Sequence, residues 1–181
     1  RQTEIKGFSL SFVQANISEL LEETYTGFKS LAEQKNIIFN LSLPQAALYA
    51  ATDLDAFSKI LNNLFSNAVK YADGEVWISL LPVKQTDLYF TIEVKNDGYL
   101  IPAAMREKIF EPFFRLKETE KQKGTGIGLA LSHSLTELHK GTLILKESEN
   151  NFNVFSLSLP IHQENEFILT AATANADNDA K

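Results

Sequence analysis

The sequence predicts a two-layer α/β sandwich, with helices on one face of a mixed, mostly antiparallel sheet. Long segments with apolar residues at three- and four-residue steps are interspersed with short segments in which apolar and polar residues alternate. The later short segments follow one another across turns, as antiparallel hairpins do. A chain of 181 residues, 44% of them hydrophobic, is long enough for one domain with a sizeable core.

The bulk properties exclude several classes of protein. The formal net charge is −6, so we expect no general attraction to nucleic acid or to an anionic membrane. The absence of cysteine excludes disulfides and thiolate metal sites. No apolar run approaches the roughly 18 residues of a membrane span, and no signal peptide opens the chain. Because the chain begins at Arg1 rather than Met, we expect it to be part of a longer protein.

The first half of the chain predicts three strands and two helices. Alternation predicts a first strand over 8–12 and a second over 37–43, and a brief third strand is expected over 48–51. Between the first two strands, helical periodicity predicts a helix over 17–35. A second helix follows over 53–71, and Asp53 is suited to cap its first turn.

The second half predicts a hairpin, two helices and a final pair of strands. Asp73-Gly74 marks a turn before the hairpin strands around 76–80 and 90–94. The two helices are a short one over 103–109 and a longer one that follows a glycine run and stops at Gly141. The last strands are expected over 142–146 and 154–159. The folded domain is thus predicted over 1–160, and the segment 161–181, rich in Ala, Asn and Asp, is predicted to be a disordered tail or linker.

One face of the helix over 53–71 carries an unusual set of polar side chains. At about 100° per residue, Asn63, Asn67 and Lys70 fall within roughly 60° of one another. Asn is a poor helix former, an Asn oxygen can ligate a hard cation, and a Lys can meet phosphate oxygens. Taken alone, these residues fit a solvated helix face better than a binding site, and the motifs downstream decide between the two interpretations.

The run Gly124-Thr125-Gly126-Ile127-Gly128 is the sharpest local signal. Alternate glycines let backbone N–H groups turn together toward an anion, and the helix that follows adds its positive end. A flexible loop before a helix is the alternative. The run is not a Walker A loop, and it does not follow the buried strand that a dinucleotide fingerprint requires, because KETEKQK precedes it.

Four motifs in order, NNLFSNAVKY, NDG..IP, FEPFF and GTGIGLAL, resemble the N, G1, F and G2 boxes of sensor histidine kinase catalytic domains. These domains share the Bergerat-type ATP-binding fold with gyrase-like ATPases, and the resemblance covers 8–160. It implies ATP and Mg²⁺ as cofactors, and transfer of the ATP γ-phosphate to a histidine on a separate dimerisation domain. It also implies a response regulator or receiver domain as partner, and a homodimeric, membrane-anchored sensor of which this chain is a cytoplasmic portion.

The resemblance assigns roles to individual residues. Asn67 matches the asparagine that holds the Mg²⁺ bridging the phosphates, and Asn63 matches its companion; Asn63 and Lys70 are the predicted catalytic residues. Lys70 reaches the phosphates and Tyr71 lies beside the base, while 115–123 matches the lid that closes over ATP. The other predicted nucleotide contacts come from the G1 box, the lid and the G2 box: Asn96, Asp97, Gly98, Arg115, Lys123, Gly124, Thr125, Gly126, Gly128 and Leu129. The F-box aromatics Phe110, Phe113 and Phe114 are expected either to anchor the lid or to be plain core.

The G1 box departs from the usual Asp-x-Gly-x-Gly, whose Asp accepts from the adenine amino group. Here Asn96 stands at the Asp position, Asp97 follows it, and Leu100 replaces the second glycine. Asn96 offers an acceptor for the amino group and a donor for a ring nitrogen, and Asp97 could take over the contact by a small backbone shift. Both remain candidates. The departures also leave an alternative function, a catalytically degenerate nucleotide-sensing or interaction module of the same fold.

The motifs favour phosphoryl transfer over hydrolysis. Gyrase-like hydrolases carry a Glu four residues before the asparagine matched by Asn67, and here that residue is Asn63, a weak base. None of the three histidines, His133, His139 and His162, lies in a helical hairpin that could present a phosphoacceptor. We therefore expect this chain alone to bind Mg·ATP without phosphorylating itself.

Overall fold

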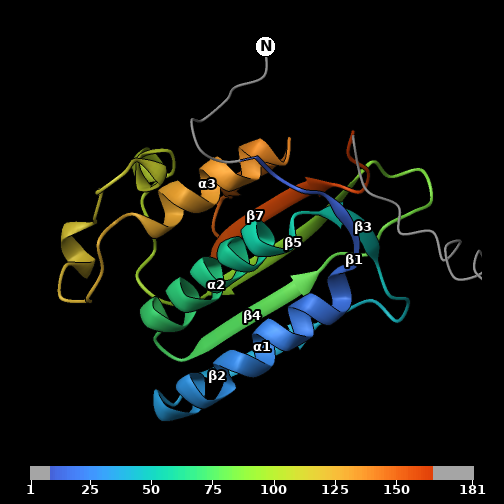
Figure 1. Cartoon of the computed structure of the whole chain (residues 1–181). Helices are drawn as coiled ribbons and strands as arrows, with labels where there is room; N and C mark the ends of the chain where they lie inside the picture. The colour runs from blue at the N-terminus through green and yellow to red at the C-terminus, as the bar shows by residue number, and fades with distance from the viewer. Residues whose placement is uncertain (1–8, 165–181) are drawn as a thin grey trace, which may run out of the picture.

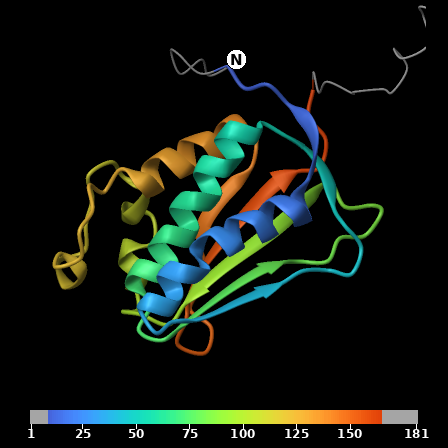
Figure 2. The same cartoon turned by 60° about the horizontal axis from the view of Figure 1, so that its bottom comes forward.

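Three helices lie on the same face of a five-stranded sheet in the computed structural model, which describes residues 9–164 (Figure 1). The turned view in Figure 2 shows the same two layers. The helices are α1 (Ile17–Gln34), α2 (Leu54–Tyr71) and α3 (Gly128–Leu138). The sheet runs in the order β2 (Ile38–Ser42), β4 (Glu75–Leu80), β5 (Tyr89–Asn96), β7 (Asn153–Pro160) and β6 (Thr142–Leu145). Only the β2–β4 pair is parallel, so the predicted mixed, mostly antiparallel sandwich is confirmed.

Helix α2 lies at the centre of the core. Asp53 caps it as predicted, because its Oδ1 accepts from the backbone N–H of Ala56 at 2.8 Å. Its buried side chains reach both the sheet and α1: Phe57 packs edge-on against Phe90 of β5, and Phe65 contacts Phe28 of α1. Burial of each such side chain contributes about 1.5–3 kcal/mol to stability, so the apolar side of α2 fixes the position of the polar side chains on its opposite face.

The first strand was predicted four to five residues too early. The structure places β1 over Val13–Asn16, paired antiparallel with β3 (Tyr49–Thr52) in a separate two-stranded sheet. Val13 pairs with Thr52, the last residue of β3, so the residues before Val13 have no strand to pair with. The backbone N–H of Ser11 donates instead to the Asp53 side chain at 2.8 Å. Phe8, the first residue of the predicted strand, lies outside the described residues.

One helix prediction also needs correction. The short helix over 103–109 is a pair of 3₁₀ turns, Ala103–Met105 and Lys108–Phe110. Helix α3 ends at Leu138, and the left-handed residue that follows it is Lys140, with φ of 59°. The N–H of Gly141 closes the helix on the Thr136 carbonyl in a Schellman motif. A glycine is required there because a Cβ would lie 2.3 Å from the Ser158 carbonyl oxygen.

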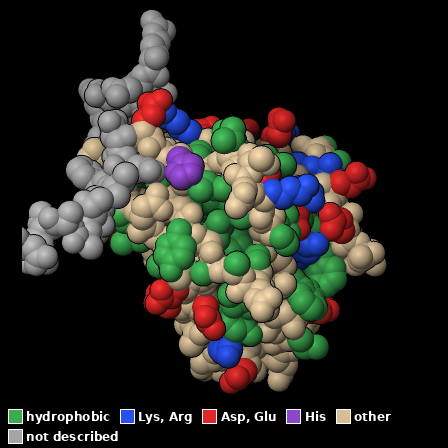
Figure 3. Space-filling view, turned by 90° about the vertical axis from the view of Figure 1, so that its right-hand side faces the viewer, with side chains coloured by type: hydrophobic (Ala, Val, Ile, Leu, Met, Phe, Trp, Pro, Cys, Tyr) green, Lys and Arg blue, Asp and Glu red, His purple; other side chains and the backbone are tan. Residues whose placement is uncertain are grey.

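The packed chain continues past the predicted boundary at residue 160. Ile161 accepts from the N–H of Ala51 at 2.8 Å and donates to the Leu88 carbonyl at 2.9 Å, which joins the small sheet to the β4–β5 loop. Figure 3 shows hydrophobic side chains on this face of the molecule, and Tyr49, Leu88 and Tyr89 are exposed. Residues 165–181, the remainder of the predicted tail, lie outside the described part of the chain.

His139 is fully buried where α3 ends beside the start of α2. Its Nδ1 lies 2.8 Å from the Leu135 carbonyl and so carries the proton, while Nε2 accepts from the backbone N–H of Asp53 at 3.3 Å. Burial lowers the pKa of His139 from 6.5 and outweighs the Leu135 hydrogen bond and the Asp53 charge, which raise it. The imidazole is therefore neutral in the folded chain.

This burial predicts a pH-dependent stability. Because the pKa of His139 is lower in the folded than in the unfolded state, its contribution is complete above pH 6.5 and is lost as the pH falls from 6.5 through the folded pKa. Urea unfolding between about pH 7.5 and 5 should show a steeper loss of unfolding free energy in the wild type than in His139→Gln. Equal slopes in the wild type and in His139→Gln would refute the assignment.

Candidate nucleotide-binding site

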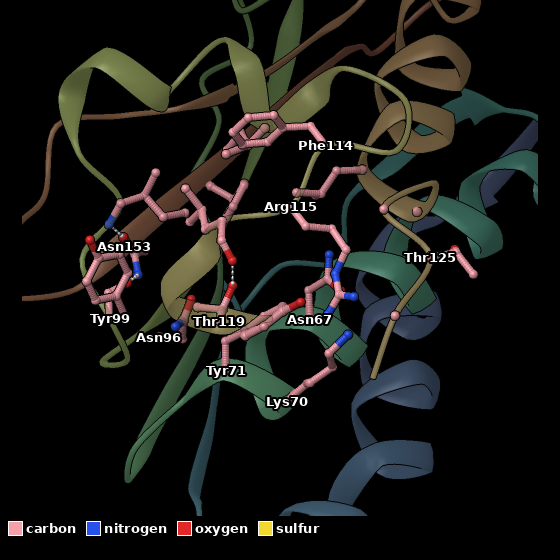
Figure 4. Close-up of a pocket in the computed structure, with 18 residues that line it drawn as sticks. Asn67, Lys70, Tyr71, Asn96, Tyr99, Phe114, Arg115, Thr119, Thr125 and Asn153 are labelled. Carbon is pink, nitrogen blue, oxygen red and sulfur yellow. Dashed lines mark hydrogen bonds between the residues drawn. The ribbon is translucent and has the colours of Figure 1, made fainter. Parts of the chain in front are cut away.

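A cavity of about 240 Å³ opens between the C-terminal end of α2, the start of α3 and the ends of β5 and β7 (Figure 4). Asn67 of α2 and Gly126 of the glycine run both line it, so the two motifs that the sequence assigned to one site do meet. The predicted residues that line the cavity are Asn67, Lys70, Tyr71, Asn96, Arg115, Gly124, Thr125, Gly126, Gly128 and Leu129.

One end of the cavity is electropositive. Lys70 and Arg115 line it, Figure 4 shows their side chains directed toward the same region as Asn67, and no acidic residue is among the lining residues. The Lys70 ammonium lies 4.7 Å from the Tyr71 ring centroid, and a Cβ at position 124 would come within 2.6 Å of its Nζ. In a chain of net charge −6, this local excess of positive charge favours an anionic ligand.

The start of α3 adds backbone donors to this end. No side chain caps the helix within the described residues, so its first N–H groups keep their hydrogen-bonding capacity beside Gly126 and Gly128. An uncapped helix N-terminus preceded by glycines is a ready anion site, because the exposed N–H groups and the helix dipole act together. The geometry therefore fits the predicted phosphate contacts.

The glycine run packs closely against the F box at Gly126. Its φ is 73°, and a Cβ there would lie 2.9 Å from both the Phe113 carbonyl carbon and the Phe114 carbonyl oxygen. The N–H of Phe113 donates to the Gly126 carbonyl at 2.9 Å. Two of the F-box aromatics pack against the core: Phe110 lies edge-on against Phe155, and Phe114 also lines the cavity. Phe113 is 73% exposed and is not part of the core.

Asn63, predicted as a catalytic residue, does not line the cavity. Its Nδ2 donates to the Gly128 carbonyl and to the Ser132 hydroxyl, each at 3.1 Å. Helix periodicity put Asn63 on the same face as Asn67, but α3 covers that part of α2. The carboxamide therefore ties the first turn of α3 to α2 and positions the glycine run.

Two further predicted contacts lie outside the cavity lining. Lys123 is exposed in the loop before Gly124. Gly98 also lies outside the lining, and a Cβ there would come within 1.8 Å of the Tyr71 carbonyl oxygen. Gly98 is thus required for close packing of the G1 loop on the end of α2.

The structure separates Asn96 from Asp97. Burial raises the pKa of Asp97, but hydrogen bonds from the backbone N–H groups of Gly74, Glu75 and Asp73 outweigh it, and the net pKa is lowered. This carboxylate holds the turn before β4 and does not line the cavity. Asn96 does line it, is 4% exposed, and has an Nδ2 with no hydrogen-bond partner among the described residues.

The motifs missed Asn153, which faces Asn96 across the β5–β7 pairing. Its Nδ2 donates to the Tyr99 carbonyl at 2.8 Å, and its Oδ1 accepts from the Ile101 N–H at 3.0 Å, so it holds the G1 loop that contains Leu100. Only the strand register could have identified this residue. The other lining residues not predicted as contacts are mostly apolar: Tyr99, Ile101, Ile109, Phe114, Leu116, Thr119 and Phe155.

The segment predicted as the lid lies along the cavity. It contains a 3₁₀ turn over Lys117–Thr119, and Leu116 and Thr119 line the cavity. Arg115 donates to the Glu120 carbonyl at 3.0 Å and to the Gln122 carbonyl, so its guanidinium holds the segment in a loop. None of the helices in the described part of the chain has the length and apolarity that a bilayer crossing requires.

Comparison with known proteins agrees with this geometry. The chain is 32% identical over 173 residues to sensor histidine kinase TmoS of Ectopseudomonas mendocina. The aligned region covers 93% of this chain and 18% of TmoS. It is 35% identical over 130 residues to sensor protein kinase WalK of Staphylococcus epidermidis. The aligned region covers 70% of this chain and 21% of WalK. The chain thus spans about a fifth of the length of these curated relatives.

Solved structures show the same fold. The catalytic domain of histidine kinase ThkA superposes with a TM-score of 0.74 at 28% identity, over 84% of this chain and 97% of that one. A structure of ThkA in complex with response regulator protein TrrA gives a TM-score of 0.70 at 25% identity, over 83% of this chain and 42% of that one. Residues 52–163, which include all four boxes, match the family described as histidine kinase-, DNA gyrase B-, and HSP90-like ATPase. The chain belongs to this ATPase family.

Proposed function

We propose that the chain is the ATP-binding catalytic domain of a sensor histidine kinase, which transfers the γ-phosphate of Mg·ATP to a histidine on a separate dimerisation domain. The observation that carries the proposal is a single cavity with a glycine-lined, cationic end and a buried, unpaired carboxamide at the other. The chain matches only about a fifth of the length of the relatives named sensor kinases, so we place the acceptor histidine in the rest of such a protein.

The lining residues fit a magnesium-bound triphosphate. Lys70, Arg115 and the N–H groups at the start of α3 would bind the phosphates, and positive charge at that position is what phosphoryl transfer requires. No cluster of three His, Cys, Asp or Glu side chains that could hold a metal exists within 9–164. Mg²⁺ is commonly bound through one or two protein oxygens together with substrate phosphates, which Asn67 could supply.

The surroundings of the cavity support transfer rather than hydrolysis. No Asp, Glu or His is among the lining residues, and the Asn63 carboxamide is engaged by α3. A group able to deprotonate an attacking water is therefore missing from the lining. The second candidate, a degenerate nucleotide-sensing module, rested on Leu100 and Asn96. The Leu100 side chain is exposed and does not line the cavity, so it does not obstruct the site, and Asn96 lines the cavity with a carboxamide that can still accept from a base.

The partners follow from the same proposal. The resemblance implies an upstream dimerisation domain, a homodimeric full-length sensor and a cytoplasmic position for this portion of it. The solved complex of ThkA with its response regulator supports a response regulator as the partner here.

The first prediction of the proposed function concerns the metal ligand. Asn67→Ala should weaken Mg·ATP binding at least about tenfold and leave metal-free ATP binding nearly unchanged, because only the metal contact is lost. Isothermal titration with and without Mg²⁺ measures both affinities. Asn62→Ala, on the exposed face of α2, is the matched control and should bind like the wild type. An equal loss with and without Mg²⁺ would argue against Asn67 as a ligand.

The second prediction concerns the glycine run. Gly126→Ala should weaken ATP binding at least about tenfold, because the Cβ clashes with the F-box backbone and φ is unfavourable. Gly27→Ala, in α1, has no atom within 4 Å of its new Cβ and should raise the unfolding free energy by up to about 1 kcal/mol with unchanged ATP affinity. Wild-type affinity in Gly126→Ala would show that the phosphates bind elsewhere.

The third prediction concerns the acceptor. Incubated with γ-labelled ATP, this chain should incorporate no label, since His139 is buried and His133 lies on α3. The same chain preceded by its native upstream helices should become labelled on histidine. Label on the isolated chain, or steady phosphate release from it, would contradict transfer to a separate domain.

A further inference from the structure

Asn96 is a buried polar side chain whose donor is unused. It lines the cavity from the end of β5, is 4% exposed, and its Nδ2 is the one buried side-chain nitrogen or oxygen without a hydrogen-bond partner within residues 9–164. Buried amides are almost always satisfied, because a lost hydrogen bond is costly away from water. Because Asn96 lines the cavity, an unsatisfied amide at this position indicates a place kept for a ligand.

The neighbouring groups do not fix which way the Asn96 amide faces. Asn153, its partner across the strands, is fully engaged, with Nδ2 on the Tyr99 carbonyl and Oδ1 on the Ile101 N–H. Asp97 is likewise engaged by three backbone N–H groups. No hydrogen bond within the described residues orients the Asn96 amide, so a half-turn of its terminal torsion exchanges donor and acceptor.

This freedom matters for the base. Adenine presents a 6-amino donor beside the N1 acceptor, and guanine presents a 6-oxo acceptor beside the N1–H donor. A carboxylate opposite the 6-position only accepts, so it selects adenine and repels the guanine oxygen. A carboxamide carries one donor and one acceptor and can match either edge after the half-turn.

We infer that Asn96 makes this cavity a purine nucleoside triphosphate site, which binds Mg·GTP as well as Mg·ATP. The inference rests on the proposed function, because it takes the triphosphate to bind at the glycine run. The wall near Asn96 is consistent with a purine ring, since Ile101, Ile109 and Phe155 provide apolar surface beside the amide. A pyrimidine ring is shorter and would not place its polar edge against residue 96.

Competition titrations with Mg·ATP, Mg·GTP and Mg·UTP test the inference on the wild type, Asn96→Asp and Asn62→Asp. In the wild type, the dissociation constants for ATP and GTP should agree within about tenfold, and UTP should bind at least about tenfold more weakly than either. Asn96→Asp should weaken GTP relative to ATP by at least about tenfold, because two acceptors then face the 6-oxo group. Asn62→Asp makes the same chemical change on the exposed face of α2 and should keep the wild-type ratio.

Since a carboxylate at a buried position can destabilise the fold, Asn96→Ala is titrated as well, and thermal unfolding confirms that each variant is folded. Asn96→Ala should weaken ATP and GTP by similar factors. A wild type that binds ATP but binds GTP more than about a hundredfold more weakly overturns the inference and leaves the proposed function standing. UTP binding equal to that of ATP, or an ATP-to-GTP ratio that neither Asn96 variant changes, also overturns it. If the wild type binds no ATP, the proposed function itself fails.

Discussion

The contact between the Asn63 carboxamide and the first turn of α3 determines the geometry of the site. The Asn63 amide donates to the Gly128 carbonyl and to the Ser132 hydroxyl. These two hydrogen bonds fix the start of α3 beside the polar face of α2. The uncapped N–H groups of α3 and the side chains of Asn67 and Lys70 consequently border the same space. Because α2 is itself fixed by its buried aromatic contacts with α1 and the sheet, the charged end of the cavity is preformed.

Most of the fold could be predicted from the sequence because its elements are strongly periodic. Helix α2 and its Asp53 cap, the β4–β5 hairpin and the start of α3 are local patterns, and the structure has them where the patterns indicate. The first strand could not be placed, because its extent depends on where β3 ends. After α3, the left-handed residue is Lys140. The glycine at position 141 is required for another reason, the close approach of the β7 backbone, which the sequence pattern does not show.

The cavity lining could be predicted where its residues belong to one contiguous motif, and it could not be predicted where tertiary packing decides. The glycine run and the Asn67–Tyr71 segment meet as their motifs imply. Asn63 stands in the N box and Asp97 in the G1 box, yet both side chains are used to hold neighbouring backbone. Asn153 has no motif at all, and its place opposite Asn96 follows only from the register of two strands separated by more than fifty residues.

The segments that enter and leave the described fold are both attached around His139. The incoming segment is attached there by the Ser11 bond to Asp53 and the Phe12 ring against the imidazole, and the outgoing segment by the bond from Gln163 to the His139 carbonyl. In Figure 1 this junction lies at the far end of α2 and α3 from the cavity. An 18-residue helix such as α2 is about 27 Å long, so the segments that enter and leave the fold lie at the opposite end of this helix from the cavity.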